Sequence, residues 1–188
     1  MKTYAIDNIR NLALISHGGA GKTSLAEALL YSSGAINRLG TIEAGNTTTD
    51  YDPDEIKRQV TINTTLAPLE WNSVKINLLD APGYFDFVGD VVGALRVADS
   101  ALIVVCAVSG VEVGTEKMWS YADDMKLPRA VFINKMDREN ADYDKTVAQL
   151  QEFFGPSVVP LQIPIGKESS LEGIVDLVEQ AGYLFSNE

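Results

Sequence analysis

The sequence predicts an α/β fold, a mostly parallel sheet with helices on both faces. Two observations support this prediction. Apolar strand-like stretches alternate with amphipathic helix-like stretches along most of the 188 residues. Short motifs rich in glycine and charged residues directly follow three of the expected strands. Because the carboxyl ends of parallel strands lie at one edge of a sheet, these motifs are expected to meet there and bind a ligand.

The first half of the chain predicts a strand, a helix and an edge hairpin. The expected elements are a strand over residues 9–15, a helix over residues 22–31 ended by Gly34, and strands over residues 60–70 and 74–79 joined by Asn72 and Ser73. Between the helix and the hairpin, residues 37–59 are rich in Gly, Asn, Thr and Asp and show little periodicity. A long polar connection of this kind is typical of a segment that moves or binds a ligand.

The second half continues the alternation of strands and helices. The expected elements are helices over residues 85–98, 115–125, 141–154 and 171–180, and strands over residues 101–108, 129–133 and 158–165. Gly155 and Pro156 break the helical pattern before the last strand. With 46% hydrophobic residues, the chain has enough apolar material for one well-packed domain.

Charge and composition exclude several classes of protein. With 26 acidic and 15 basic side chains, this acidic chain is not expected to bind nucleic acid directly on its own. Its longest uncharged apolar run, residues 101–108, is far shorter than the roughly 20 residues that a membrane span needs. The N-terminal residues lack the apolar stretch of a signal peptide, and the single cysteine, Cys106, is expected to be a core residue. A cytoplasmic setting is therefore expected.

The first motif predicts a loop that binds phosphate. Its residues are His17, Gly18, Gly19, Ala20, Gly21, Lys22, Thr23 and Ser24. The glycines let consecutive backbone N–H groups face phosphate oxygens, and the positive end of the following helix faces the same anion. Lys22 is expected to reach the β- and γ-phosphates and Thr23 to bind magnesium. The strict motif has glycine where Ser16 stands, and a glycine-rich turn without a ligand is the alternative. His17 is interpreted as a loop residue, not a catalytic one.

The second motif, Asp80 to Gly83, predicts contacts with the metal and the γ-phosphate. Asp80 ends an apolar strand, from which it can hold magnesium through a water, and Gly83 leaves its N–H free to approach the γ-phosphate. Thr61 can join the metal shell when GTP is present, which predicts an order-disorder switch over residues 37–61. The alternatives are a simple turn at Asp80 and a β-branched strand residue at Thr61.

The third motif, Asn134 to Asp137, predicts the choice of base. The carboxylate of Asp137 can accept two hydrogen bonds from the N1–H and the N2 amine of guanine, and adenine offers no such pair of donors. Asn134 and the stem of Lys135 would brace the base. Together the motifs predict a site for GTP or GDP with magnesium. They argue against the third class considered, an ATP-dependent protein with the same phosphate loop.

From Arg10 to about Leu177 the chain resembles translational GTPases, and most of all the nucleotide-binding domain of the elongation factor G family. NLALISHGGAGKTSLAEALL is similar to that family's N-I-G-I-S-A-H-I-D-A-G-K-T segment, and VSGVEVGTEKMW, RAVFINKMDR and VVPLQIPIG match it nearly throughout. The resemblance implies a Ras-like GTPase fold, GTP hydrolysis and a switch coupled to the ribosome. A ribosomal protection protein and peptide-chain release factor 3 are the alternatives within this group.

Three departures from that family indicate a paralogue of elongation factor G. Tyr84 stands where the family's D-T-P-G-H has histidine, Gly19 replaces an aspartate of the phosphate loop, and Gln59 replaces the glycine of R-G-I-T-I. By resemblance, Tyr84 is placed nearest the attacking water, with Lys22, Gly83 and Thr61 as the other catalytic residues. A phenol orients water but carries no imidazolium charge near pH 7. The second functional hypothesis is therefore a GTP/GDP sensor with little hydrolysis.

The resemblance also sets the expected domain organisation. Residues 1–155 are expected to form the GTP-binding domain, and residues 156–188 the start of a truncated inserted subdomain. The family's S-A loop, which supports the guanine, has no counterpart after Asn134. The alternative is an intact minimal GTPase in which the strand over residues 158–165 fills the last place in the sheet.

Overall fold

The computed structural model describes residues 3–185, so the expected domain ends at residues 1–2 and 186–188 lie outside it. Within this part, five strands form one sheet in the order β2-β3-β1-β4-β5. The strands are β1 (Ile9–Ser16), β2 (Thr65–Trp71), β3 (Val74–Asp80), β4 (Ser100–Cys106) and β5 (Arg129–Asn134). Strand β1 pairs in parallel with β3 and with β4, and β2 pairs antiparallel with β3. The predicted α/β class and the edge hairpin are confirmed.

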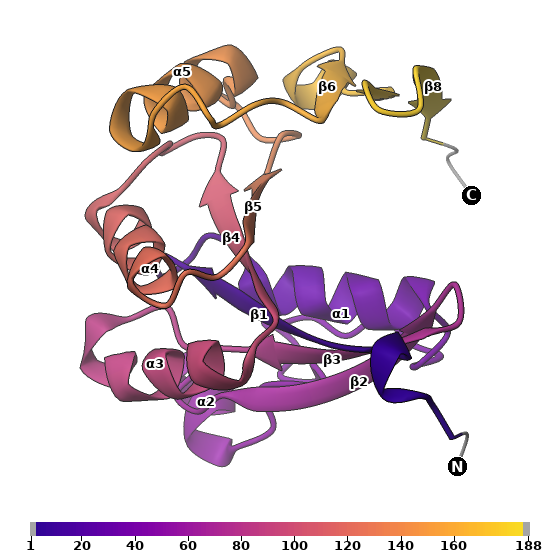
Figure 1. Ribbon diagram of the computed structural model, residues 1–188, viewed down its shortest axis with the longest axis vertical. Coiled ribbons are helices and arrows are strands. Elements are labelled where there is room, and N and C mark those ends of the chain that lie inside the picture. The colour runs from indigo at the N-terminus through magenta and orange to yellow at the C-terminus, as the bar shows by residue number, and fades with distance from the viewer. Residues whose placement is uncertain (1–2, 186–188) are drawn as a thin grey trace. The chain divides into compact units, whose positions relative to one another are not determined.

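The helices of this part are α1 (Lys22–Ser32), α2 (Pro53–Arg58), α3 (Val88–Val97) and α4 (Val113–Asp124). Figure 1 shows α1 on one side of β1 and β3, and α3 on the other. Side chains of a strand alternate between the two faces of a sheet, and the core follows this alternation. Leu14 and Leu78 pack with Leu30 of α1 in one buried cluster. Ala13 and Ile15, also fully buried, point to the opposite face, where α3 and α4 contact β1.

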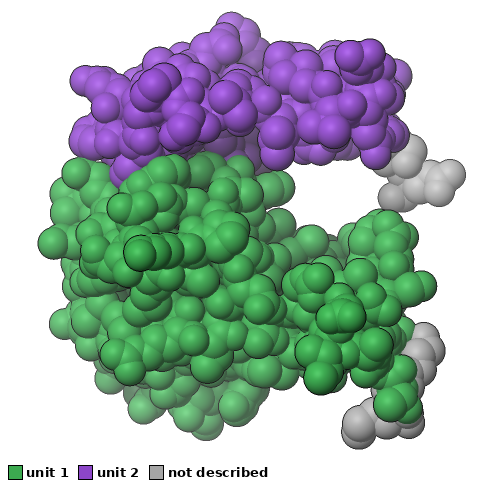
Figure 2. Space-filling model, viewed as in Figure 1, with its two compact units in different colours: residues 1–104, 113–132 green, residues 105–112, 133–188 purple. Residues whose placement is uncertain are grey.

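The structure divides into two compact units, which are coloured separately in Figure 2. Residues 1–104 and 113–132 form the first unit, and residues 105–112 and 133–188 form the second. The second unit contains α5 (Tyr143–Phe154) and a three-stranded antiparallel sheet of β6 (Gln162–Ile165), β7 (Gly173–Asp176) and β8 (Ala181–Leu184). Strand β6 therefore belongs to this small sheet and does not take the last place in the large one, which was the alternative for residues 158–165.

The helix expected over residues 171–180 is wrong, because this stretch forms β7 and the turn that leads to β8. Apolar residues occur there at helical spacing, but Ile174 and Val175 are β-branched residues, which favour a strand. In this strand they pair with Pro164 and Ile163 of β6. The Asp176 carboxylate then accepts hydrogen bonds from the backbone N–H groups of residues 178 and 179, at 2.9 Å each, and so fixes the turn.

The polar connection over residues 37–59 contains a helix that was not predicted, α2. Asp52 caps it, because its side chain accepts a hydrogen bond from Asp54 N at 2.8 Å while Glu55 reaches back to Asp52 N. Pro53 begins the helix, where its missing N–H costs nothing. Strand β2 begins at Thr65 and not at residue 60, because the backbone of residues 62 and 63 bonds to Glu55 instead of to a strand.

The remaining elements differ from expectation mainly at their ends. The helix expected over residues 85–98 is a 3-10 turn, Phe85–Phe87, followed by α3. Asp142 caps α5 by accepting a hydrogen bond from Lys145 N at 2.9 Å, so this helix begins two residues later than residue 141. Gly34, with φ of 73°, follows the end of α1 as predicted. Asn72 and Ser73, both with positive φ, form the hairpin turn between β2 and β3.

Candidate functional site

The glycine-rich loop between β1 and α1 belongs to the first unit. Gly19 and Gly21 adopt φ angles of 81° and 99°, a left-handed conformation in which glycine is not strained. Gly21 caps α1, so the free N–H groups of the first helical turn face the loop. His17 packs against the start of α4, where a Cβ added to Gly114 would overlap its ring. Ser24 is exposed in the first turn of α1, and Ala20 is buried.

Lys22, the first residue of α1, is buried. Its Nζ donates a hydrogen bond to Ser16 Oγ at 2.9 Å, and Ser16 Oγ in turn donates to the carbonyl oxygen of His17 at 2.6 Å. Ser16, which replaces the first glycine of the strict motif, therefore helps to place the lysine. Burial lowers the pKa of Lys22, while the charges of Asp80 and Asp50 oppose this shift. A buried ammonium group is stabilised when an anion such as phosphate binds beside it.

The loop after β3 lies directly against the glycine-rich loop. A Cβ added to Gly83 would come within 2.6 Å of Lys22 Nζ and 3.0 Å of Gly18 Cα. A Cβ added to Gly18 would come within 2.9 Å of Cζ of Tyr84, so the tyrosine ring rests on the backbone of the glycine-rich loop. Tyr84 itself is 46% exposed. The structure thus brings the predicted residues Gly18, Lys22, Gly83 and Tyr84 together.

Asp80, the last residue of β3, is fully buried. Its Oδ2 accepts a hydrogen bond from Thr49 Oγ1 at 2.7 Å. Its Oδ1 is buried and accepts no hydrogen bond from the residues that the structure describes. Burial raises the pKa of Asp80, and the Lys22 charge opposes this rise. A buried carboxylate oxygen without a partner is the kind of atom that a cation would satisfy.

The two threonines predicted to bind metal lie side by side. Thr23 Oγ1 and Thr61 Oγ1 are 3.0 Å apart, and Thr61 Oγ1 donates a hydrogen bond to Asp50 Oδ1 at 2.8 Å. Asp50 was not predicted. Burial raises its pKa to about 6 against the opposing hydrogen bond from Thr61, and the nearby carboxylates of Asp80 and Glu55 add to the rise. The sequence held a signal for it, because Asp50 directly follows three consecutive threonines in the polar connection, and such a run offers several oxygen ligands.

The oxygen atoms of Asp80, Thr23 and Thr61 suit magnesium, which binds partly through water and phosphate, better than a metal that binds through protein side chains alone. Within residues 3–185 there is no group of three His, Cys, Asp or Glu side chains able to hold a metal ion. Magnesium is typically bound through one or two carboxylates together with waters and substrate phosphates. The free Oδ1 of Asp80 and the paired hydroxyls of Thr23 and Thr61 match that donor set.

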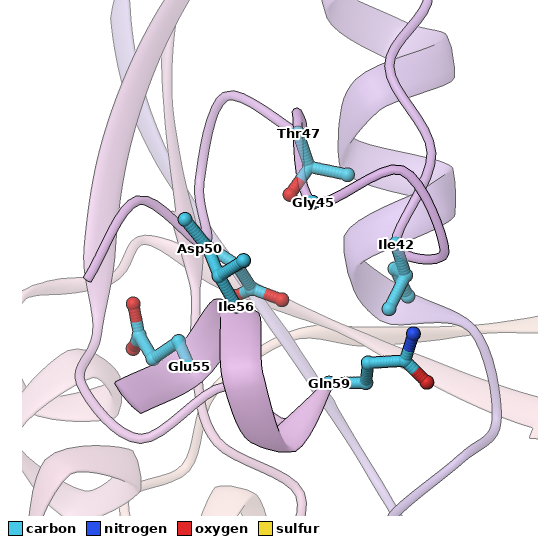
Figure 3. A pocket seen from close by; sticks show the side chains of 7 residues that line it. All are labelled: Ile42, Gly45, Thr47, Asp50, Glu55, Ile56 and Gln59. Atoms are coloured by element: carbon cyan, nitrogen blue, oxygen red, sulfur yellow. The ribbon is translucent and has the colours of Figure 1, made fainter. Parts of the chain in front are cut away.

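Gln59 occupies a strained position next to this cluster. It ends α2 with φ of 55°, a left-handed conformation that costs a residue with a Cβ about 1 kcal/mol. This explains physically why glycine suits the same place in the family that the sequence resembles. Figure 3 shows the small hollow beside it, which is lined by Ile42, Gly45, Thr47, Asp50, Glu55, Ile56 and Gln59.

The predicted base-recognition motif lies in the second unit, at the end of β5. Its loop is held through the backbone, because Asn134 O accepts from Ala107 N at 2.8 Å and Met136 O accepts from Glu168 N at 3.1 Å. Lys135 has φ of 61°, which turns the chain sharply. Asp137 is exposed at the end of this turn. The site residues predicted for the phosphates and the metal thus belong to the first unit, and those predicted for the base to the second.

Cys106 is half-buried and not the core residue that was expected. It lines a hollow of the second unit together with Val108, Ser109, Lys135, Arg138 and Glu139. Burial raises the pKa of its thiol, but hydrogen bonds from the Ser109 and Val108 backbone outweigh burial, so the pKa is lowered overall. The side chain leaves the core because β4 ends there and the chain turns back at Gly110.

The fold and these two sets of residues define an α/β domain of the Ras-like, phosphate-loop class. The chain belongs to the family described as the elongation factor Tu GTP binding domain, whose sequence profile matches residues 7–183. The predicted resemblance to translational GTPases is therefore confirmed. No helix within residues 3–185 has the length and apolar character needed to cross a membrane.

Comparison with individual proteins is consistent with this family. The chain is similar to an elongation factor G-like protein of Thermotoga maritima, at 39% identity over 183 residues that cover 97% of this chain and 26% of that protein. It is 42% identical to elongation factor G 1 of Treponema denticola over 173 residues, which cover 92% of this chain and 25% of the relative. A crystal structure of a Thermus thermophilus protein superposes with a TM-score of 0.90 at 43% identity, covering 95% of this chain and 27% of that one. The chain spans about a quarter of the length of these relatives.

Proposed function

We propose that the chain binds GTP and GDP with magnesium and hydrolyses GTP, as the nucleotide-binding domain of an elongation-factor-G-like protein. We further propose that this cycle is coupled to the ribosome in the cytoplasm. One arrangement carries the proposal: the buried ammonium of Lys22 lies against Gly83, and Oδ1 of Asp80, without a partner among the described residues, is buried at the end of β3 in the same unit. A positive charge and an available metal-ligand atom, presented together by two loops, suit a nucleotide with its cation.

The phosphate side of this site is assigned residue by residue. The backbone of residues 17–21 and the start of α1 would hold the β-phosphate, with the ammonium of Lys22 between the β- and γ-phosphates. Thr23 and Thr61 would hold magnesium directly, and Asp80 through a water. Magnesium, when bound, would neutralise charge on the β- and γ-phosphates.

Hydrolysis on this arrangement depends on positioning and on charge stabilisation. Gly83 would offer its N–H to the γ-phosphate, and Lys22 would stabilise the negative charge that develops on its oxygens. The half-exposed phenol of Tyr84, which rests on Gly18, is the side chain that would orient the attacking water. Asn134, Lys135 and Asp137 would contact the base, with the Asp137 carboxylate accepting the two hydrogen bonds from guanine.

The same tyrosine supports a second candidate function, a GTP/GDP sensor with little hydrolysis. Its ring packs on the glycine-rich loop, and a phenol, unlike an imidazole, cannot become a cation that stabilises negative charge. Such a site would bind nucleotide and change conformation without rapid turnover. The two functions share every binding residue and differ only in the rate of the chemical step.

Calorimetric titration with GDP and with ADP, each in magnesium buffer, tests nucleotide binding. We expect tight binding of GDP and no measurable binding of ADP, since adenine lacks the donor pair that Asp137 accepts. Equal binding of both nucleotides would refute the assignment of Asn134–Asp137 to the base. Binding of neither would refute the proposed function for this chain.

Hydrolysis is tested by single-turnover assays of the wild type and of Tyr84→His, with GDP affinity measured in parallel. If the phenol limits the reaction, the substitution accelerates turnover several-fold and leaves GDP affinity within about twofold, which favours the sensor. An unchanged rate in Tyr84→His would show that Tyr84 does not limit hydrolysis.

A further inference from the structure

A buried glutamate on α1, Glu27, fastens part of the polar connection to the helix. Its side chain is 1% exposed. Its Oε1 accepts a hydrogen bond from Gly40 N at 2.9 Å, and its Oε2 accepts one from Thr48 N at 2.8 Å. Both carboxylate oxygens are therefore used to hold the backbone of a segment that is 13 and 21 residues away in sequence. None of the roles assigned above involves Glu27.

The position of Glu27 on α1 links it to the metal side of the site. It follows Thr23 by four residues, and side chains at this spacing lie on the same face of a helix, one turn apart. One face of α1 thus presents the hydroxyl proposed to bind magnesium and, a turn later, the carboxylate that holds the polar connection. The helix fixes the distance between these two functions.

The residues that Glu27 holds lead straight into the proposed metal site. Thr48 is bonded to Glu27 through its backbone, the next residue donates its hydroxyl to Asp80 Oδ2 at 2.7 Å, and the one after accepts from Thr61 Oγ1 at 2.8 Å. Residues 48–50 therefore form a clip with three successive bonds, to α1, to β3 and to the threonine before β2. Loss of the first bond would free the other two to move.

A second buried glutamate holds the residues that follow the polar connection. Glu55, also 1% exposed, accepts from Ile62 N at 2.9 Å and from Asn63 N at 3.0 Å through Oε1. These two bonds flank Thr61 on its C-terminal side. Asp50 and Thr61 thus lie between a fixed point at Glu27 and another at Glu55, which leaves little freedom to either side chain.

We propose that Glu27 is a positioning residue that holds the clip formed by residues 48–50, and thereby sets the magnesium affinity of the GTP-bound site. It does so through backbone bonds and without contact to the nucleotide. Because it acts on the part of the site expected to respond to the γ-phosphate, its removal weakens magnesium binding with GTP more than with GDP. The inference rests on the proposed magnesium site. Its structural part, the fastening of the clip, does not need any ligand.

The first experiment compares wild type with Glu27→Gln and with a matched control, Glu116→Gln, which changes an exposed glutamate of α4. In Glu27→Gln an amide NH₂ faces one of the two backbone donors, so one bond becomes a repulsive contact. Limited trypsin digestion of the nucleotide-free proteins reports on the clip, because Arg38, Lys57 and Arg58 are exposed in the segment around it. We expect cleavage at these sites to be at least about fivefold faster in Glu27→Gln and unchanged in Glu116→Gln.

The second readout is the magnesium concentration at half-maximal binding of a non-hydrolysable GTP analogue. We expect this midpoint to rise about tenfold in Glu27→Gln, which is the effect of losing one charge-assisted hydrogen bond. GDP affinity at saturating magnesium is expected to stay within about twofold of wild type. The control is expected to match wild type in both measurements.

A second variant approaches the same carboxylate through its other bond, from Gly40 N, and leaves α1 intact. In Gly40→Ala, the added Cβ would overlap the Asn46 carbonyl oxygen and come within 2.7 Å of Glu27 Oε1. It therefore displaces the carboxylate that holds Thr48 N without removing its charge. Its control is Gly93→Ala in α3, where an added Cβ meets nothing within 4 Å. We expect Gly40→Ala to reproduce both effects of Glu27→Gln and Gly93→Ala to show neither.

The outcomes separate this inference from the proposed function. If neither Glu27→Gln nor Gly40→Ala accelerates cleavage, Glu27 does not fasten the clip and the inference is overturned. Faster cleavage with an unchanged magnesium midpoint overturns its positioning role. If the wild type binds neither GDP nor the GTP analogue at saturating magnesium, the proposed function fails, and the dependence of magnesium affinity on Glu27 fails with it.

Discussion

The phosphate side and the base side of the proposed site are built in different ways. On the phosphate side, in the first unit, buried side chains make the decisive contacts, among them Lys22 with Ser16 and Thr49 with Asp80. On the base side, in the second unit, backbone hydrogen bonds hold the loop and Asp137 is exposed at its surface. The first arrangement keeps its ionisable side chains away from water. The second leaves Asp137, the carboxylate proposed to recognise guanine, exposed to water.

This difference implies a cost in stability on the phosphate side alone. Burial raises the pKa of Asp80, because the folded protein disfavours the charged form of this carboxylate. If Asp80 binds a cation as proposed, stability is sacrificed for that function, a trade-off known from functional sites in general. An exposed carboxylate carries no such cost. Substitutions on the phosphate side should therefore weaken binding while they preserve or raise stability. Substitutions on the base side should change binding alone.

The largest effect is expected for Asp80→Asn. The amide resembles the neutral form that burial favours, so the thermal midpoint of the nucleotide-free protein should be equal to or higher than that of wild type. Binding of a GTP analogue in magnesium should weaken about 100-fold, because a buried charge aimed at the cation is lost. Calorimetry and thermal unfolding measure the two quantities, with exposed Asp124→Asn as the control. A marked fall in the thermal midpoint would show that the charged carboxylate stabilises the fold, and would contradict the conclusion that the phosphate side carries a cost in stability.

A smaller effect, confined to binding, is expected for Asp137→Asn. An amide cannot accept both guanine hydrogen bonds, so GDP affinity should fall about 30-fold to 100-fold, as for the loss of a charge-assisted pair. The free energy of unfolding without nucleotide should change by less than about 0.5 kcal/mol, because the side chain is exposed. Exposed Asp144→Asn in α5 is the matched control. If Asp137→Asn lowered stability by several kcal/mol, the base side would also depend on side-chain contacts of the folded loop.

The large sheet and the motifs at its edge could be predicted from the sequence because their signals are local. An apolar run followed by glycine or by a conspicuous charge indicates where β1, β3 and β5 end, and the structure confirms those ends within about a residue. Helix α2 was equally open to prediction. The order Asp52, Pro53, Asp54, Glu55 is a capping box with proline at the first helical position.

Other features depend on contacts between distant residues, which periodicity does not reveal. The apolar residues of 171–180 fit helical spacing, yet their pairing with β6 makes them a strand. The same holds for the clip over residues 48–50, whose partners Glu27 and Asp80 lie 21 and 31 residues away. Tertiary contact overrides local pattern in both cases.

The smallest predicted effect, a pH dependence of stability, tests whether Asp50 shares the cost carried by Asp80. Its pKa in the folded protein is about 6, above the ordinary value of 3.8, so the folded state holds this proton more tightly than the unfolded state does. The contribution of Asp50 to the stability of the nucleotide-free protein should therefore fall as the pH rises from about 4 to about 7. In Asp50→Asn that contribution is absent.

Urea unfolding of both proteins at pH 4.5 and pH 7 measures this contribution. The difference in unfolding free energy, Asp50→Asn minus wild type, should grow between these values by about 1 kcal/mol after allowance for screening by solvent. Asp80 titrates in the same direction but is present in both proteins, so its effect cancels to first order. A difference that shrinks with rising pH would mean that the Thr61 hydrogen bond and the Lys22 charge outweigh burial at Asp50. The phosphate side would then hold one disfavoured carboxylate and one favoured one, and its cost would rest on Asp80 alone.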